Sequence, residues 1–184
     1  MAEIEQQQAQ VLEVINDFME REREYVKQLD DCMQQYIARL KLRDTPWKQQ
    51  LMRDSSMKPL IASFEALASQ STQLFQDARS ETLTVDAVML GLRFSLNYAP
   101  MLSQFSQYQE VYLRAGNQLR VLANNAYFKK FQENVQNTNM PMLVYFGLPL
   151  RHIYEYTDTM KKLHALTPEQ NADFEHQKLS LIHI

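Results

Sequence analysis

The residue in this sequence that most suggests a functional role is Glu22, because its carboxylate interrupts an otherwise apolar stripe. Positions 15, 22, 29 and 36 are seven apart, so on a helix they form one column occupied by Ile, Glu, Leu and Tyr. Burying an unpaired carboxylate costs several kcal/mol. Glu22 must therefore reach solvent, find an internal partner, or lie in a gap where another protein docks.

The other chemically versatile side chains form no catalytic or metal-binding pattern. The histidines lack the spacing of a metal site or a catalytic triad, and they are His152, His164, His176 and His183. No serine lies in a nucleophile elbow, and three glycines are too few for a phosphate-cradling loop. The single Cys32 has no cysteine or histidine at zinc-ligand spacing. We therefore expect no catalytic residue, no bound metal and no cofactor.

The composition favours a helical protein without a basic surface. The 184 residues are 45% hydrophobic, which is enough for one substantial core. Three glycines and six prolines, beside ten methionines, favour long helices over sheets and tight turns. The net charge of -3 supplies no basic surface for a phosphate backbone, so a nucleic-acid partner is not expected.

The sequence carries no signal for export or membrane insertion. It begins Met-Ala-Glu and continues with glutamine-rich polar residues rather than with a basic and then apolar leader. No apolar run approaches the roughly 18 residues that a membrane span needs. A lone cysteine fits a reducing compartment. These features predict a cytoplasmic protein.

The spacing of apolar residues predicts the helices that must position Glu22. The first helix is predicted from about Glu5 to Leu40. The segment that follows, Arg43 to Pro46, cannot continue it, because proline lacks a backbone donor and restricts the residue before it. Gly147 and Pro149 predict an irregular or kinked start to the helix at 142–166. The other predicted helices cover residues 57–78, 85–94, 100–122, 126–135 and 167–184, with loops at 80–84 and 136–139. This pattern predicts an all-α fold, a single elongated helical bundle of about six main helices.

Three segments, in order, match a known set of conserved regions. Residues 18–29, FMEREREYVKQL, resemble the first region, with Glu22 on the glutamate of its T-E-x-x-Y-V-x-x-L pattern. Residues 98–112 and 125–131 resemble the aromatic middle region. Residues 146–166 resemble the third region, L-L-K-P-x-Q-R-x-x-K-Y-P-L-L-L-K-E-L, followed by Thr-Pro. With these three segments the chain resembles Dbl-homology domains, the exchange-factor domains for Rho-type GTPases.

The resemblance extends over residues 1–184 and implies a guanine-nucleotide exchange factor that binds a Rho-family small GTPase and promotes GDP release without covalent chemistry. It implies that Glu22 contacts the switch I segment of the GTPase, and that Arg151, His152 and Glu155 belong to the helix facing the switch regions. The family's last helix would be incomplete at residue 184, and no pleckstrin-homology domain would follow in this chain. In the free protein we expect Phe18 and Leu29 to be buried and Glu22 to be substantially accessible.

Several residues of the third region depart from the family pattern. Leu148, Arg151, His152, Glu155 and Thr157 stand where the pattern has Lys, Gln, Arg, Lys and Pro. In the family, the lysine that corresponds to position 155 reaches switch II of the GTPase. Glu155 therefore reverses the charge of a partner contact. A degenerate domain that serves as a scaffold or GTPase-binding module without exchange activity is therefore a second hypothesis.

A plain bundle of the spectrin or coiled-coil type is a third hypothesis. Its apolar columns would need no glutamate at position 22. It would also need no irregular Gly147-x-Pro149 entry into a helix.

Overall fold

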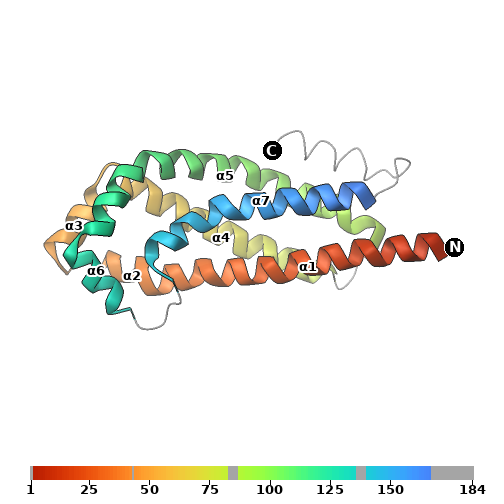
Figure 1. Cartoon of the computed structure of the whole chain (residues 1–184), viewed down its shortest axis with the longest axis horizontal. Helices are drawn as coiled ribbons and strands as arrows, with labels where there is room; N and C mark the ends of the chain where they lie inside the picture. Colours follow the sequence, from red (N-terminus) through yellow and green to blue (C-terminus); the bar gives the residue numbers. More distant parts are fainter. Residues whose placement is uncertain (1, 43, 83–86, 136–139, 167–184) are drawn as a thin grey trace.

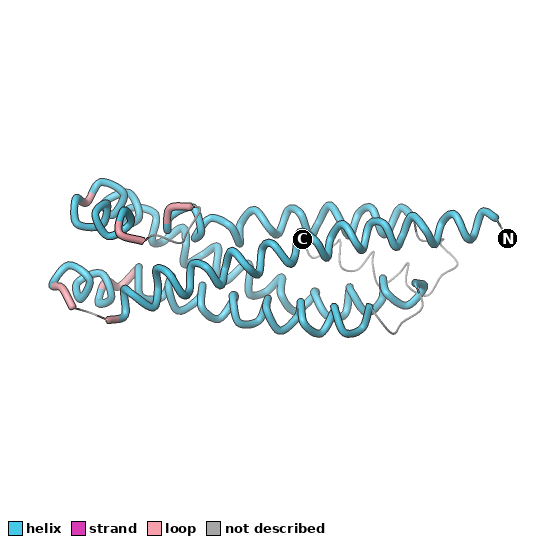
Figure 2. Tube along the Cα trace, turned by 90° about the horizontal axis from the view of Figure 1, so that it is seen from below, coloured by secondary structure: helices cyan, strands magenta, loops and turns pink. Residues whose placement is uncertain are grey.

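The chain is an elongated bundle of helices that lie side by side (Figure 1). A computed structural model describes residues 2–42, 44–82, 87–135 and 140–166. Within these residues there is no strand, and nearly all of them are helical (Figure 2). The prediction of an all-α, elongated bundle is confirmed.

Four long helices form the body of the bundle. α1 spans Ala2–Cys32, α4 Met57–Thr82, α5 Ala87–Asn124 and α7 Met142–Leu166. α1 packs against α4, α5 and α7, and α5 also packs against both α4 and α7. Among the described helices, none is both long enough and apolar enough to cross a membrane.

The first helical rod continues beyond α1. A π-helical turn, η1 (Met33–Ile37), joins it to α2 (Ala38–Lys41) without a break. A π turn inserts one residue into the helical repeat, and here Tyr36 and Ile37 are both buried. The rod agrees with the helix predicted from Glu5 to Leu40. If the rod is counted once, the described residues contain six helices.

Two short helices, α3 (Pro46–Arg53) and α6 (Ala126–Glu133), lie with α2 at one end of the bundle (Figures 1 and 2). Trp47 of α3 contacts the ring of Phe128 in α6 edge to face, with ring centroids 6.3 Å apart. The side chain of Asn125 accepts a hydrogen bond from the Phe128 backbone N–H, which caps α6. α6 was predicted, whereas α3 was missed because Pro46 was read only as a helix end. Proline also suits the first turn of a helix.

The predicted break before Pro100 is wrong. α5 is one helix from Ala87 to Asn124, with Pro100 inside it. A proline within a helix removes one backbone hydrogen bond, but Met101 and Phe105 on the next turns are buried in the bundle. Burial of those side chains offsets the lost hydrogen bond.

The predicted start of the loop at 80–84 is also wrong. α4 continues to Thr82, two residues beyond that start.

Two other predicted features, the loop at residues 136–139 and the helix from residue 167 onward, lie outside the described residues. The same holds for the prediction that this last helix is incomplete.

The sequence predicted an irregular or kinked start to the helix at 142–166, but α7 runs as one uninterrupted helix through Gly147 and Pro149. Pro149 has no N–H to donate to the carbonyl one turn earlier. A hydrogen bond from α5 supports the same turn, since the Tyr108 hydroxyl donates to the Phe146 carbonyl at 2.7 Å in a buried position. Tyr108 therefore fixes the start of the helix that carries Arg151, His152 and Glu155.

Tyr108→Phe should lower the free energy of unfolding by about 1 kcal/mol, because it removes one buried hydrogen bond while it keeps the ring. Chemical denaturation of the purified chain measures the change. Tyr127→Phe is the matched control, since Tyr127 is 68% exposed, and it should change stability by less than about 0.5 kcal/mol. Equal effects of the two substitutions would contradict this role of Tyr108.

Candidate functional site

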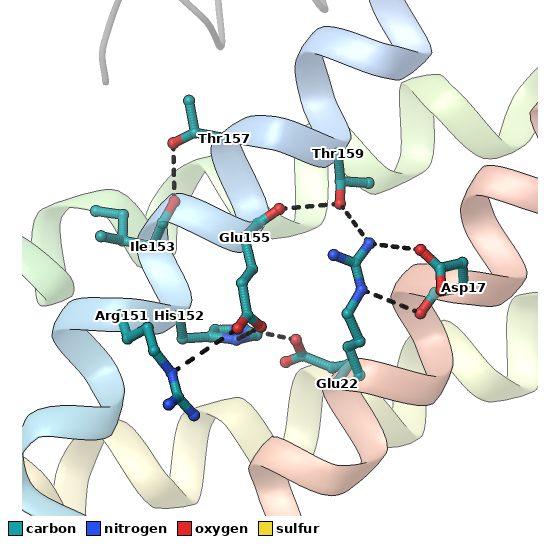
Figure 3. A network of polar contacts seen from close by, with 9 residues as sticks. Asp17, Glu22, Arg151, His152, Ile153, Glu155, Thr157 and Thr159 are labelled. Carbon is teal, nitrogen blue, oxygen red and sulfur yellow. Dashed lines mark hydrogen bonds and ion pairs between the residues drawn. The ribbon is translucent and has the colours of Figure 1, made fainter.

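Three residues of the first region on α1, Phe18, Glu22 and Leu29, face the interior of the bundle. Phe18 and Leu29 are fully buried, as predicted. The prediction that Glu22 is accessible is wrong, because only 1% of its surface is exposed. Its Oε2 atom lies 2.7 Å from Nε2 of His152 on α7 (Figure 3). Of the alternatives that the sequence left open for this carboxylate, the free protein adopts the internal partner.

His152 is held between two carboxylates and several aromatic rings. Its Nδ1 atom lies 3.5 Å from Oε2 of Glu155, on the side of the ring away from Glu22. Its ring stacks on that of Tyr25, with centroids 3.7 Å apart and planes 6° from parallel. The ring centroids of Phe18 and Phe105 lie 6.4 Å and 6.1 Å from the ring centroid of His152. A buried imidazolium with counter-ions at both nitrogens satisfies the charge of Glu22.

The charges around His152 determine its protonation. Burial alone would lower the pKa of His152, but the negative charges of Glu22 and Glu155 outweigh it and raise the pKa to about 9. The contact with His152 lowers the pKa of Glu155, against partial burial, and the charges of Arg151 and Arg21 lower it further. Near neutral pH, His152 is therefore a cation and Glu155 an anion.

Arg151 and Glu155 lie at the surface above the buried pair. Arg151 is 68% exposed, and its Nε atom lies 3.9 Å from Oε1 of Glu155, which is 35% exposed. Exposed ion pairs of this length contribute little to stability. The four predicted site residues thus lie together, but Glu22 and His152 are beneath the surface and Arg151 and Glu155 are on it.

Arg21 is a member of this network that the sequence did not single out. It forms an ion pair with Asp17 at 2.9 Å and donates to the Thr159 hydroxyl of α7 at 3.4 Å (Figure 3). The hydroxyl of Thr159 in turn donates to the Glu155 carbonyl. In the sequence, Arg21 and Arg23 with Glu20 and Glu24 indicate only an ordinary solvated face. Their link to α7 depends on how the helices pack.

A pocket of about 130 Å³ opens on the surface where α1 and α7 meet, and we call it the outer pocket. Its walls include Arg21 and Gln28 of α1 and Arg151 and Glu155 of α7, while the rings of Tyr25 and His152 line its inner part. The walls carry both signs of charge. Among the described residues, no cluster of His, Cys, Asp and Glu could hold a metal ion. The mixed charges of these walls suit contact with a polar surface.

Comparison with known proteins identifies the family. The model of the RhoGEF domain family matches residues 14–184. The chain belongs to the RhoGEF domain family. No curated protein sequence matches the chain.

Solved structures share the fold of this RhoGEF domain at low sequence identity. A structure of Vav1 inhibited by an allosteric inhibitor matches 96% of this chain, with a TM-score of 0.69 and 15% identity. The DH/PH domains of PDZ-RhoGEF, in a complex with activated RhoA, match 97% of it, with a TM-score of 0.68 and 14% identity. This RhoGEF domain covers 45% and 51% of those two chains, about half of their lengths.

In this RhoGEF domain, Glu22→Ala should lower the free energy of unfolding by roughly 3 to 5 kcal/mol, because it leaves the buried charge of His152 without its nearest partner. Thermal and chemical denaturation measure the loss. Glu24→Ala, on the exposed side of the same helix, is the control and should cost less than about 0.5 kcal/mol. A Glu22→Ala protein as stable as the parent would show that the pair contributes nothing.

The stability of the RhoGEF domain should also fall as pH rises. The pKa of His152 is higher in the folded chain, about 9, than the ordinary 6.5. Its protonation therefore stabilises the fold fully below about pH 6.5, and this contribution disappears as pH rises through about 9. The expected loss is on the order of 3 kcal/mol.

Denaturant titrations across this pH window test the effect. The slope should persist in His164→Gln, which removes another histidine from α7, and should vanish in His152→Gln. A slope that survives in His152→Gln would assign the titration to another group.

Proposed function

We propose that this chain is a guanine-nucleotide exchange factor domain that binds a Rho-family small GTPase and promotes release of its GDP. The observation that carries the proposal is the RhoGEF family match over residues 14–184. Such a domain makes no covalent bond. It binds the nucleotide-free GTPase tightly, and by linkage it weakens nucleotide binding by the same factor. Each tenfold of weakening requires about 1.4 kcal/mol of differential contact.

The surface that we assign to the GTPase is the rim of the outer pocket, between α1 and α7. Arg151 and Glu155 are exposed there and present charges of both signs. Glu22 and His152 lie directly beneath them. In the free protein these two residues hold the surface in place, and Glu22 can touch a GTPase only after its pair with His152 separates.

The structural neighbours support the class of partner. PDZ-RhoGEF DH/PH domains, which share the fold, were solved in a complex with activated RhoA. We extend to this chain only the class of partner, a Rho-family GTPase, because identity with that neighbour is 14%. We further propose that residues 1–184 act as one such domain in the cytoplasm, without a cofactor and without a nucleic-acid partner.

A second candidate is a domain that binds the GTPase but does not release its nucleotide. Glu155 favours this candidate, since it is acidic where the family pattern has lysine. The burial of Glu22 favours it as well, because the family's glutamate contact is withheld in the free protein.

A nucleotide-release assay separates the two candidates. Rho-family GTPases loaded with fluorescent GDP are mixed with the chain, and loss of fluorescence is followed with and without it. Binding of the chain to each nucleotide-free GTPase is measured in parallel. Exchange activity predicts faster release for at least one GTPase, whereas the second candidate predicts binding without faster release. Absence of both across the panel contradicts the proposed function.

Glu155→Lys should increase the rate of nucleotide release by about tenfold, the effect of roughly 1.4 kcal/mol of added contact. The substitution restores the charge that the family pattern places against switch II. Glu155→Gln removes the negative charge without adding a positive one and should give a smaller increase. A slower release with Glu155→Lys would mean that the carboxylate of Glu155 is itself needed, either by the partner or as the counter-ion of His152.

A further inference from the structure

A single side chain separates Glu22 from the surface pocket. Below the outer pocket lies an inner cavity of about 10 Å³, lined by Glu22 and His152 together with residues of α5 and α7. His152 lines both spaces, and no other residue does. The imidazole ring therefore forms the wall between them.

The inner cavity offers the Glu22 side chain no other route to the surface. Its volume is about that of one water molecule. The remaining lining side chains are buried, and they are Met101, Leu102, Phe105 and Tyr156. The route from Glu22 to the outer pocket thus passes through the position of the His152 ring.

The contacts of the ring allow it to move outward. On the inner side, the polar contact of the ring is the ion pair of its Nε2 atom with Oε2 of Glu22, at 2.7 Å. On the outer side, the partly exposed Glu155 offers a second carboxylate. The outer pocket, at about 130 Å³, has room for several waters, since roughly 10 to 15 Å³ of such space holds one. It can therefore receive an imidazole ring.

We propose that the His152 side chain is a gate: turned inward it pairs with Glu22 and withholds that carboxylate, and turned outward toward Glu155 it opens Glu22 to a docked GTPase. The identity of the partner rests on the proposed function. The gate is a property of the chain itself, so it can be tested without any GTPase.

Carboxylate labelling of the free chain tests the gate directly. A water-soluble carbodiimide and an amine modify accessible carboxylates, and mass spectrometry gives the rate at each residue. Glu20 and Glu24, exposed on the same helix, report the rate for open positions. Glu22 should react slowly in the parent chain and about tenfold faster in His152→Ala, as expected when a protected site becomes open.

Met160→Ala is the matched control for general loosening of the bundle. Met160 is as buried as His152 and lies on the same helix, but it lines neither space. In Met160→Ala, Glu22 should remain protected. Free imidazole should slow the labelling of Glu22 in His152→Ala and raise its melting temperature, because it refills the site of the missing ring, and it should do neither in Met160→Ala.

His152→Gln provides a second variant if the alanine protein does not fold, since it keeps a polar side chain of similar length. Circular dichroism confirms folding before labelling. A folded His152 variant in which Glu22 stays protected overturns the gate, and so does equal exposure of Glu22 in Met160→Ala.

Binding to nucleotide-free GTPases then tests the link to function. The open variant should bind about tenfold more tightly than the parent, a gain of roughly 1.4 kcal/mol. Adding Glu22→Gln to it should remove the gain. If no GTPase binds any variant, the proposed function fails while the labelling result stands. If binding occurs but opening the gate never tightens it, the assignment of Glu22 to the GTPase is overturned.

Discussion

The buried ion pair between Glu22 and His152 is the interaction on which the α1–α7 interface depends. Each partner has almost no exposed surface, and neither could remain charged there alone without a cost of several kcal/mol. Each therefore requires the helix that carries the other. The pair fixes the register of α1 against α7, and with it the position of Arg151 and Glu155 on the surface above.

The departures from the family pattern are connected through this pair. His152 stands where the pattern has arginine, and Glu155 where it has lysine. In the structure these two residues are neighbours, and Glu155 provides the second counter-ion of His152. Considered alone, Glu155 is a charge reversal relative to that pattern. Considered with His152, it is part of an internal arrangement that keeps an imidazolium stable between two carboxylates.

This arrangement bears on how the proposed exchange activity would be controlled. The internal pair with His152 competes with the partner for Glu22. The free energy needed to separate that pair is therefore subtracted from the free energy of any contact that Glu22 makes with a GTPase. On this proposal the rest of the bundle need not change, because Phe18, Leu29 and Tyr108 are buried among other core residues. Substitution at His152 would then raise the proposed activity while it lowers stability.

The sequence by itself determined the helical fold, the extent of α1 and α7, and the burial of Phe18 and Leu29, because these follow from apolar residues at helical spacing. It also singled out Glu22 as a carboxylate that needed an explanation. Only the tertiary structure decided which explanation holds, since the partner of Glu22 lies 130 residues away along the chain, a separation that spacing within one helix cannot reveal. The same limit explains the error at Pro100, where burial of the following turns keeps α5 continuous despite a local helix breaker.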